Sequence, residues 1–259
     1  MDNPTWVEGY LGGGLEFDGR TNYVETNYTE DLAKWTICTW AISPAAPAAT
    51  SPTGPVHREK NYQIDWNHTD ATYRSAAAMR VGGTWRAASL GALSGNTWYH
   101  LAASFDGTAL KAYVNGALIT STPVSGVPDA EVGTLKLGRH STAAQFFTGT
   151  IDDVRVYSRA LTDEEIKKTM QGDPLMAWGP EPATGATVDI RDADSLSWSA
   201  GEGAAQHDVY FGQDRDAVKM ADTTSPLYQG RQGGTSFSLA GLAELGGGSY
   251  FWRIDEGAA

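Results

Sequence analysis

The carboxylates of this chain are the first residues to consider for chemistry. Two acids two positions apart on a strand face the same side, where one can donate and the other accept a proton at a glycosidic bond. Glu16 and Asp18 begin such a pattern, but Arg20 and Thr21 stand where a further acid would continue it. A hydrolytic site would therefore need acids from different strands, and the candidates for it are Glu16, Asp65, Asp70 and Glu131.

Flat aromatic side chains offer a second chemistry, because they stack on the C–H faces of sugars while nearby polar groups fix the hydroxyls. One aromatic-rich segment spans residues 62–85, and a shorter one lies at 139–146. The candidate ligand-binding residues are Tyr62, Trp66, Asn67, His68, Tyr73, Trp85, His140 and Phe146. For Trp66 and Trp85 the alternative is packing inside a β-sandwich, and the sequence leaves both interpretations open.

Nucleophilic and transition-metal chemistry find little support. The five histidines are scattered without an H-x-H or H-E-x-x-H pair, and the chain has no G-x-S-x-G motif. The single cysteine, Cys38, lies in an apolar stretch between Trp35 and Trp40, so we interpret it as a buried small hydrophobic residue. One cysteine also excludes a multi-cysteine zinc or iron–sulfur site.

Short strands must position these side chains. Apolar stretches alternate with turn residues along the whole chain, which has 30 glycines, and this is typical of an all-β sandwich. Asp106-Gly107 supplies the positive φ of a tight turn, which predicts a hairpin over 98–114. Thr162 and Glu165 form a capping box that predicts one short helix. In the first part of the chain, the strands that we expect are 14–17, 23–26, 36–42, 62–66, 76–80, 84–89, 98–105, 109–114, 134–137 and 150–157.

The composition excludes several classes of partner. The chain of 259 residues is long enough for one large all-β domain or two ordinary domains. Its 31 acidic and 19 basic residues give a formal net charge of −12, which repels a phosphate backbone, so we expect no nucleic-acid partner. No apolar run approaches the length of a membrane span and no export signal opens the chain, so we expect a soluble chain without a membrane partner.

Four motifs occur in a fixed order over residues 6 to about 170. They are GGLEFDG at 13–19, WTICTW at 35–40, WYHLAASFDG with KAYVNG at 98–116, and FTGTIDDVRVYSRAL at 147–161. In this order they resemble the laminin-G-like domains of the concanavalin A-like lectin/glucanase superfamily. The resemblance implies a jelly-roll sandwich, and this superfamily includes both sugar-binding proteins and glycanases.

The C-terminal part carries a second set of motifs: PEP at 180–182, LSW at 196–198, HDVYFG at 207–212 and YFWRID at 250–255. They resemble a fibronectin type III-like module, a smaller sandwich of the immunoglobulin kind, as found in secreted bacterial enzymes. Prolines make 173–186 an extended connector. We therefore expect a jelly roll over 1–174 and a truncated module over 175–259, with edge-strand self-association wherever a sheet edge is left open.

The laminin-G-like resemblance also implies a structural Ca²⁺, with Asp18 and Asp152 as its candidate ligands. Carboxylates and backbone carbonyls are the oxygen ligands that this cation takes. The alternative is that Asp18 forms an Asx turn and that Asp152 caps a strand end by hydrogen bonds alone. The sequence does not decide between the two.

The function favoured by these patterns is non-catalytic binding of a polysaccharide, by a module of a secreted multidomain protein located outside the cell or at its surface. The first alternative is an endoglucanase-like glycoside hydrolase that acts on a β-glucan with a carboxylate pair. The second alternative is a protein-adhesion module, for which an exposed apolar patch would speak.

Overall fold

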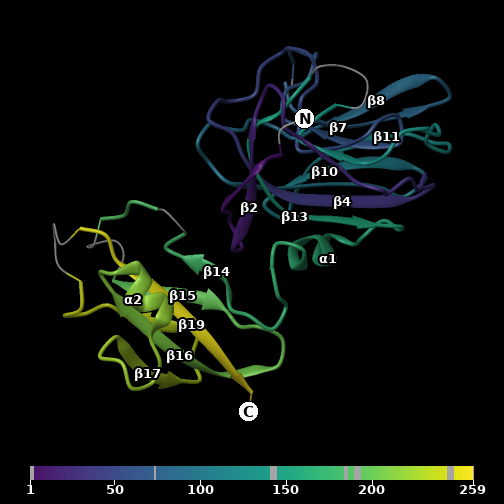
Figure 1. Cartoon of the computed structure of the whole chain (residues 1–259). Coiled ribbons are helices and arrows are strands. Elements are labelled where there is room, and N and C mark those ends of the chain that lie inside the picture. The colour runs from purple at the N-terminus through teal and green to yellow at the C-terminus, as the bar shows by residue number, and fades with distance from the viewer. Residues whose placement is uncertain are drawn as a thin grey trace. The chain divides into compact units, whose positions relative to one another are not determined.

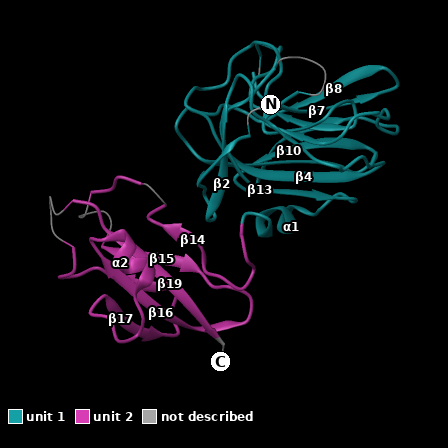
Figure 2. Ribbon diagram, in the orientation of Figure 1, with its two compact units in different colours: residues 1–170 teal, residues 171–259 magenta. Residues whose placement is uncertain are grey.

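The computed structural model covers the chain and describes residues 3–72, 74–140, 145–183, 186–189, 194–243 and 248–258. These residues form two compact units, 1–170 and 171–259 (Figure 2). Antiparallel strands dominate both units, which confirms the all-β prediction. No helix in the described part of the chain is long and apolar enough to cross a membrane.

The first unit contains a seven-stranded sheet in the order β1-β2-β13-β4-β9-β10-β11 (Figure 1). Chain-distant strands are neighbours in it, since β13 lies between β2 and β4. Its strands are β1 (Thr5–Glu8), β2 (Gly13–Asp18), β4 (Trp35–Ile42), β9 (Tyr99–Phe105), β10 (Ala109–Val114), β11 (Ala117–Pro123) and β13 (Thr148–Tyr157).

A six-stranded sheet packs against the first across the core, in the order β3-β12-β5-β6-β7-β8. Its strands are β3 (Val24–Glu25), β5 (Val56–Arg58), β6 (Tyr62–Asp65), β7 (Ala76–Val81), β8 (Thr84–Ser89) and β12 (Lys136–Leu137). Strands β5 and β6 are buried along their whole length, which means that their outward side is covered as well.

The core between the sheets is formed by alternate residues of each strand. Trp35 and Ile37 of the seven-stranded sheet meet Tyr62 and Ile64 of the six-stranded sheet in one cluster of buried side chains. Burial of side chains of this size contributes about 1.5–3 kcal/mol each. Because neighbours on a strand point to opposite sides, the core positions of Tyr62 and Ile64 turn the intervening polar residues outward.

Local sequence signals explain the turns and the first helix. The predicted hairpin is present as β9 and β10, and Asn115-Gly116, with φ of 49° and 75°, then joins β10 to β11. Helix α1 (Asp163–Lys168) begins at the predicted capping box of Thr162 and Glu165. It packs against the other side of the seven-stranded sheet in a small cluster that includes buried Cys38, as predicted.

The second unit consists of two three-stranded sheets, β14-β15-β18 and β17-β16-β19, whose side chains share a core around Leu196 and Trp198. The expected connector over 173–186 is corrected by β14, which pairs with β15 inside that range. Strand β14 lies at a sheet edge, where Pro180 can be accommodated without a ladder donor. The elements are β14 (Trp178–Glu181), β15 (Ser195–Ser199), β16 (Ala204–Gly212), α2 (Arg215–Met220), β17 (Tyr228–Gln232), β18 (Ser236–Ser238) and β19 (Phe251–Ala258).

Candidate functional site

The outward side of the six-stranded sheet brings several sequence candidates together. Strand register aligns His57, Gln63, Ala78 and Ala87 in one row across β5, β6, β7 and β8, with Asp65 beside Ala76 in the next row. Ala76 and Ala78 are themselves buried, so this side of the sheet is covered at its centre. We call this surface the outer face; its residues are His57, Gln63, Asp65, Ala76, Ala78, Arg80, Trp85 and Ala87.

A buried polar group that we call the Asp65 cluster occupies one end of the outer face; its members are His57, Gln63, Asp65, His68 and His140. The Nε2 amide of Gln63 donates to both carboxyl oxygens of Asp65, at 3.1 and 3.0 Å. His57 Nε2 lies 3.5 Å from Asp65 Oδ1, and His68 Nε2 lies 3.9 Å from Asp65 Oδ2. The ring of His140 stands edge-on to that of His57, with ring centroids 5.0 Å apart.

Burial fixes the protonation of this cluster. Asp65 is fully buried, and burial raises its pKa to about 8 despite the amide of Gln63. Burial, helped by His140, lowers the pKa of His57 well below its ordinary value. Burial also lowers the pKa of His68 and His140, against the opposing charges of Asp70 and Glu59. At neutral pH the cluster therefore holds an uncharged carboxylic acid among uncharged imidazoles.

The cluster also has unused hydrogen-bonding capacity. In the described part of the chain, both ring nitrogens of His57, Oε1 of Gln63 and Nδ1 of His140 have no hydrogen-bond partner. His57 is 0% exposed and Gln63 is 3% exposed. Buried polar atoms are almost always satisfied by protein or water, and each one left open costs about 1–3 kcal/mol. The open atoms of His57 and Gln63 lie on the outward side of the sheet, and that side is covered here, so they are not accessible from solvent.

Aromatic side chains border the outer face. Trp85 is 46% exposed and stands opposite Arg80 at the edge strand β8, so one of its faces is available for stacking. Near the other edge, the guanidinium of Arg139 lies 4.6 Å from the ring centroid of Tyr23 and 5.3 Å from that of half-buried Phe146. Trp85 and Phe146 are thus the predicted aromatic residues with exposed surface.

Two other aromatic candidates are corrected by the structure. Tyr62 is fully buried and packs against Trp35, because its place on β6 points into the core. Trp66 is 1% exposed, and its Nε1 donates to the carbonyl of Ala45 at 3.0 Å. Neither ring can offer a face to a sugar. The remaining aromatic candidate, Tyr73, lies outside the described residues.

Asn67 and Asp70 support the loops beside the cluster. Asn67 Oδ1 accepts from the Ala48 amide at 2.9 Å and its Nδ2 donates to Thr53, which fastens the 44–55 loop to the end of β6. The Asp70 amide donates to His68 Nδ1 at 3.1 Å. That bond leaves the proton of the neutral His68 ring on Nε2, the atom that faces Asp65.

Two of the carboxylates proposed for hydrolysis lie on opposite sides of the sandwich. Glu16 is exposed between core-facing Leu15 and Phe17, so it points away from the core on the seven-stranded sheet. Asp65 points away from the core on the six-stranded sheet. Sheets in a sandwich pack about 10 Å apart, so acids on the two outer surfaces are too far apart to act as a pair.

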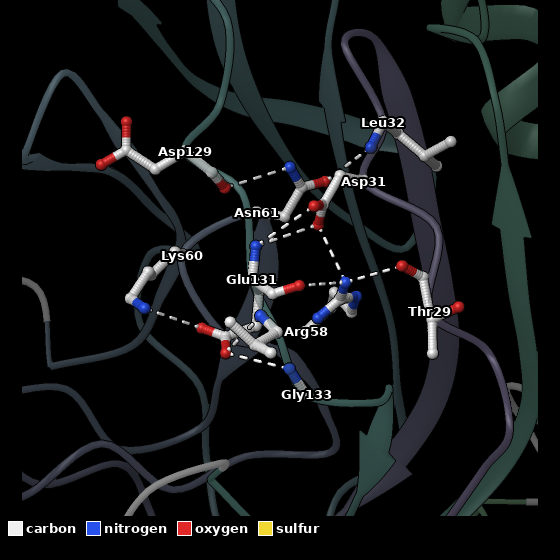
Figure 3. Close-up of polar contacts among 10 residues, drawn as sticks. Thr29, Asp31, Leu32, Arg58, Lys60, Asn61, Asp129, Glu131 and Gly133 are labelled. Atoms are coloured by element: carbon white, nitrogen blue, oxygen red, sulfur yellow. Dashed lines mark hydrogen bonds and ion pairs between the residues drawn. The ribbon is translucent and has the colours of Figure 1, made fainter.

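Glu131 has a structural role in a network around Arg58 (Figure 3). Buried Arg58 donates through Nη2 to the carbonyls of Thr29 and Glu131, at 2.7 Å each, and to Asp31 Oδ1 at 2.9 Å. Lys60 Nζ lies 3.2 Å from the Glu131 carboxylate. Burial tends to raise the pKa of Glu131, but the Gly133 amide and Lys60 outweigh it and hold the pKa below its usual range.

The two candidate calcium ligands are not brought together. Three backbone amides, of Arg20, Thr21 and Asn22, donate to Asp18 Oδ1 at 2.8–3.3 Å and lower its pKa, as in the alternative of a local turn. Asp152 Oδ2 accepts from the amide of Leu11 at 2.8 Å.

The strand register separates these two acids. Asp18 pairs with Thr148, and Asp152 lies four positions further along β13, about 13 Å away at the usual rise per residue. One Ca²⁺ with ligands at roughly 2.3–2.6 Å cannot bridge that gap, so this pair does not fit a shared calcium site. The described residues contain no group of three or more His, Cys, Asp or Glu side chains that could hold a metal ion.

Comparisons with known proteins agree with this fold. A family model described as the concanavalin A-like lectin/glucanases superfamily, Laminin_G_3, matches residues 18–167. Domain 4 of AbnA, a GH43 extracellular arabinanase from Geobacillus stearothermophilus solved with arabinotriose, is 18% identical, with a TM-score of 0.55 over 66% of this chain and 82% of that chain. The binding domain of botulinum neurotoxin serotype D is 12% identical, with a TM-score of 0.50 over 70% of this chain and 47% of that chain. At these identities the likeness concerns the fold.

A curated human protein also matches part of the chain. Usherin is 32% identical over 92 residues, which is 33% of this chain and 2% of usherin. The chain thus spans a small fraction of that relative's length.

Sequence reasoning missed His57 and Gln63 as site residues. The signal was present, because Tyr62-Gln63-Ile64-Asp65 alternates apolar and polar residues and so places Gln63 and Asp65 on the same side of a strand.

Proposed function

Because residues 18–167 show that the chain belongs to the concanavalin A-like lectin/glucanase superfamily, we propose that its first unit binds a carbohydrate at the outer face. In this proposal Trp85, which is 46% exposed, stacks on a sugar ring. Fold alone does not define a ligand, so the proposal depends on the site.

One observation carries the proposal: Trp85 on the edge strand β8 is 46% exposed and lies on the outward side of the six-stranded sheet, opposite Arg80. An exposed flat aromatic ring is the kind of group that stacks on the C–H face of a sugar.

Two features lead us to favour binding over hydrolysis. Glu16 and Asp65 lie on opposite outer surfaces, and Glu131 is committed to Lys60 and backbone amides. The structurally similar AbnA domain was solved with arabinotriose, which supports a glycan as the class of partner to test first.

We further propose that the module belongs to a secreted protein and acts outside the cell. AbnA is described as an extracellular arabinanase, and human usherin shares sequence with this chain over 92 residues. The second unit, whose motifs resemble a fibronectin type III-like module, would then space the binding unit from further domains. Repetition of weak sites in such proteins raises avidity.

The test combines binding and catalysis in one panel. The full chain is incubated with soluble and insoluble polysaccharides, and both retention and new reducing ends are measured. We expect retention without new reducing ends. The Trp85→Ala variant should bind about 5- to 30-fold more weakly, because a stacked aromatic ring at a binding site contributes on the order of 1–2 kcal/mol.

Trp6→Ala is the matched control, since Trp6 is 73% exposed on β1 of the other sheet. Retention on no polysaccharide, or equal weakening by Trp85→Ala and Trp6→Ala, would contradict the proposal. New reducing ends would make the chain a hydrolase instead.

A further inference from the structure

We propose that Trp85, Arg80 and Asp129 form one sugar-binding subsite, which takes a ring with two adjacent free hydroxyls. The first unit then binds 1,4- or 1,5-linked glycans in preference to 1,3-linked ones. This inference rests on the proposed function, because it names the class of carbohydrate that stacks on Trp85. Three observations carry it: the position of Arg80 beside Trp85, the accessible polar atoms of Arg80 and Asp129, and the placement of the other cations.

The first observation is that a tight turn sets Arg80 directly beside Trp85. Gly82 and Gly83, with φ of 56° and 79°, form the two-residue turn that joins β7 to β8. Arg80 and Trp85 face each other across this hairpin, on the outward side of the sheet. The Cβ atoms of such directly opposite residues lie about 4.5–5.5 Å apart, so the guanidinium and the ring share one surface.

Asp129 reaches the same surface from a segment that is distant in the sequence. Its backbone amide donates to the carbonyl of Arg80 at 2.7 Å, and its Oδ2 accepts from the amide of Gly83 at 3.0 Å. Arg80 Nε lies 3.7 Å from the same Oδ2. The carboxylate is thus fixed against the hairpin that carries Trp85.

The second observation is that polar atoms of this pair are accessible, unlike those of the Asp65 cluster. The side chain of Arg80 is 34% exposed and that of Asp129 is 24% exposed. Arg80 Nε is buried, but its two Nη atoms and Asp129 Oδ1 are neither buried nor hydrogen-bonded within the described part of the chain. Donors and an acceptor therefore face solvent beside the exposed ring of Trp85.

This combination of groups suits a sugar ring with two adjacent hydroxyls. A guanidinium donates, a carboxylate accepts, and a hydroxyl does both. One hydroxyl can accept from Arg80 while its neighbour donates to Asp129, and the C–H face of the same ring packs on Trp85. Units inside a 1,4-linked pyranose or a 1,5-linked furanose chain keep two adjacent hydroxyls free. Units inside a 1,3-linked chain have no such pair.

The third observation is that the other cations around this hairpin face elsewhere or are paired. Exposed Arg86 follows Trp85 on β8, so its side chain starts from the core side of the sheet. Exposed Arg74 precedes β7 and lies at the end of that strand away from the hairpin. The ammonium of Lys60 lies 3.2 Å from Glu131. The position of Arg86 therefore offers a matched control for the guanidinium beside the ring.

The experiment compares gels of two glucans that differ in linkage. Phosphoric-acid-swollen cellulose is β-1,4-linked and has adjacent free hydroxyls along its length, whereas curdlan is β-1,3-linked and lacks them inside the chain. Linear 1,5-arabinan and 1,4-galactan, which also carry adjacent hydroxyls, complete the panel. The affinity of the full chain for each polymer is measured by depletion from solution or affinity electrophoresis. We expect at least one of the other three polymers to bind about ten-fold or more tightly than curdlan.

Arg80→Gln and Asp129→Asn test the polar pair on the polymer that binds best. Each should weaken binding about ten-fold, because a hydrogen bond to a charged group is lost. The asparagine can still accept from the amide of Gly83, so the turn keeps this contact. Arg86→Gln and Glu16→Gln, the matching changes at exposed positions away from the ring, should bind as the wild type does.

Urea unfolding of every variant separates a loss of binding from a loss of folding. Should Arg80→Gln lower the urea midpoint, Arg80→Lys takes its place. Lysine keeps the charge and the long stem but presents a single nitrogen, so it should also bind about ten-fold more weakly than the wild type.

The outcomes separate the two proposals. Equal or tighter binding of curdlan would overturn this inference and leave carbohydrate binding intact. Wild-type affinity in folded Arg80 and Asp129 variants, with binding still weakened by Trp85→Ala, would do the same. Tighter binding by Asp129→Asn would also overturn it, because Arg80 would then serve an anionic group. Retention on none of the polymers would overturn the proposed function itself.

Discussion

The buried acid of the outer face makes a prediction about stability that needs no ligand. In the unfolded chain Asp65 ionises near its ordinary pKa of 3.8, whereas in the folded chain burial raises the pKa to about 8. Between these values the folded state binds one more proton than the unfolded state. Its contribution to the free energy of unfolding must therefore fall as the pH rises through this window and level off above pH 8.

The magnitude follows from the same shift. Each pH unit within the window is worth at most about 1.4 kcal/mol, so the full span sets an upper limit of roughly 6 kcal/mol. Local relaxation and water entry reduce this to a few kcal/mol. Asp65→Asn removes the titration and keeps the shape. We expect the variant to match the wild type near pH 4.5 and to exceed it by about 2–4 kcal/mol at pH 8.

The assay is urea unfolding of both proteins at half-unit pH steps from 4.5 to 9, followed by tryptophan fluorescence. The difference between the two curves isolates the carboxyl group of residue 65, together with the effect of its charge on His57, whose Nε2 lies 3.5 Å away. A difference that stays constant with pH would refute the reasoning. A wild type that gains relative stability as the pH rises would also refute it, since that is the behaviour of an ion-paired carboxylate.

Three further predictions concern Trp66, Asp18 and Arg58. Trp66→Ala should lower the free energy of unfolding by about 3–5 kcal/mol in urea titrations, since the ring fills the core. An unchanged urea midpoint of unfolding would mean that the core does not need this ring. Asp18→Asn should lower the melting temperature slightly, because three backbone amides lose a charged acceptor. We expect no shift in melting temperature on addition of Ca²⁺ or a chelator to either protein, and a rise confined to the wild type would restore the calcium interpretation. Arg58→Met should lower the free energy of unfolding by about 3 kcal/mol, since two carbonyls and Asp31 lose their donor. An unchanged unfolding free energy in calorimetry would mean that the network of Figure 3 does not stabilise the fold.

Much of the fold could be predicted because its signals are local. The hairpin of β9 and β10 depends on a turn dipeptide between apolar runs, and α1 begins at a capping box only four residues long. Strand β5, Val56–Arg58, was missed since three residues that include a histidine and an arginine show no strand periodicity. What makes it a strand is its pairing on both sides, with nearby β6 and with β12, which lies about 80 positions further along the chain.

The site was harder to predict for a related reason. Alternation places Gln63 and Asp65 on one side of β6, but whether that side is exposed to solvent or covered depends on segments that lie elsewhere in the chain. The same uncertainty led to Tyr62 and Trp66 being expected at a surface, whereas Trp85, of the same residue class, is exposed. Residue type gives the chemistry that is available, and tertiary burial decides which of it is used.

The network around Arg58 also bears on how slowly the first unit should unfold. Arg58 joins Thr29 and Glu131, which are 29 and 73 positions away in the sequence, so these bonds form only after two long loops have closed. Interactions that are absent from the folding transition state do not speed folding; they raise the barrier to unfolding. The buried guanidinium would thus raise the barrier to unfolding and lengthen the lifetime of the native fold without changing how fast it forms.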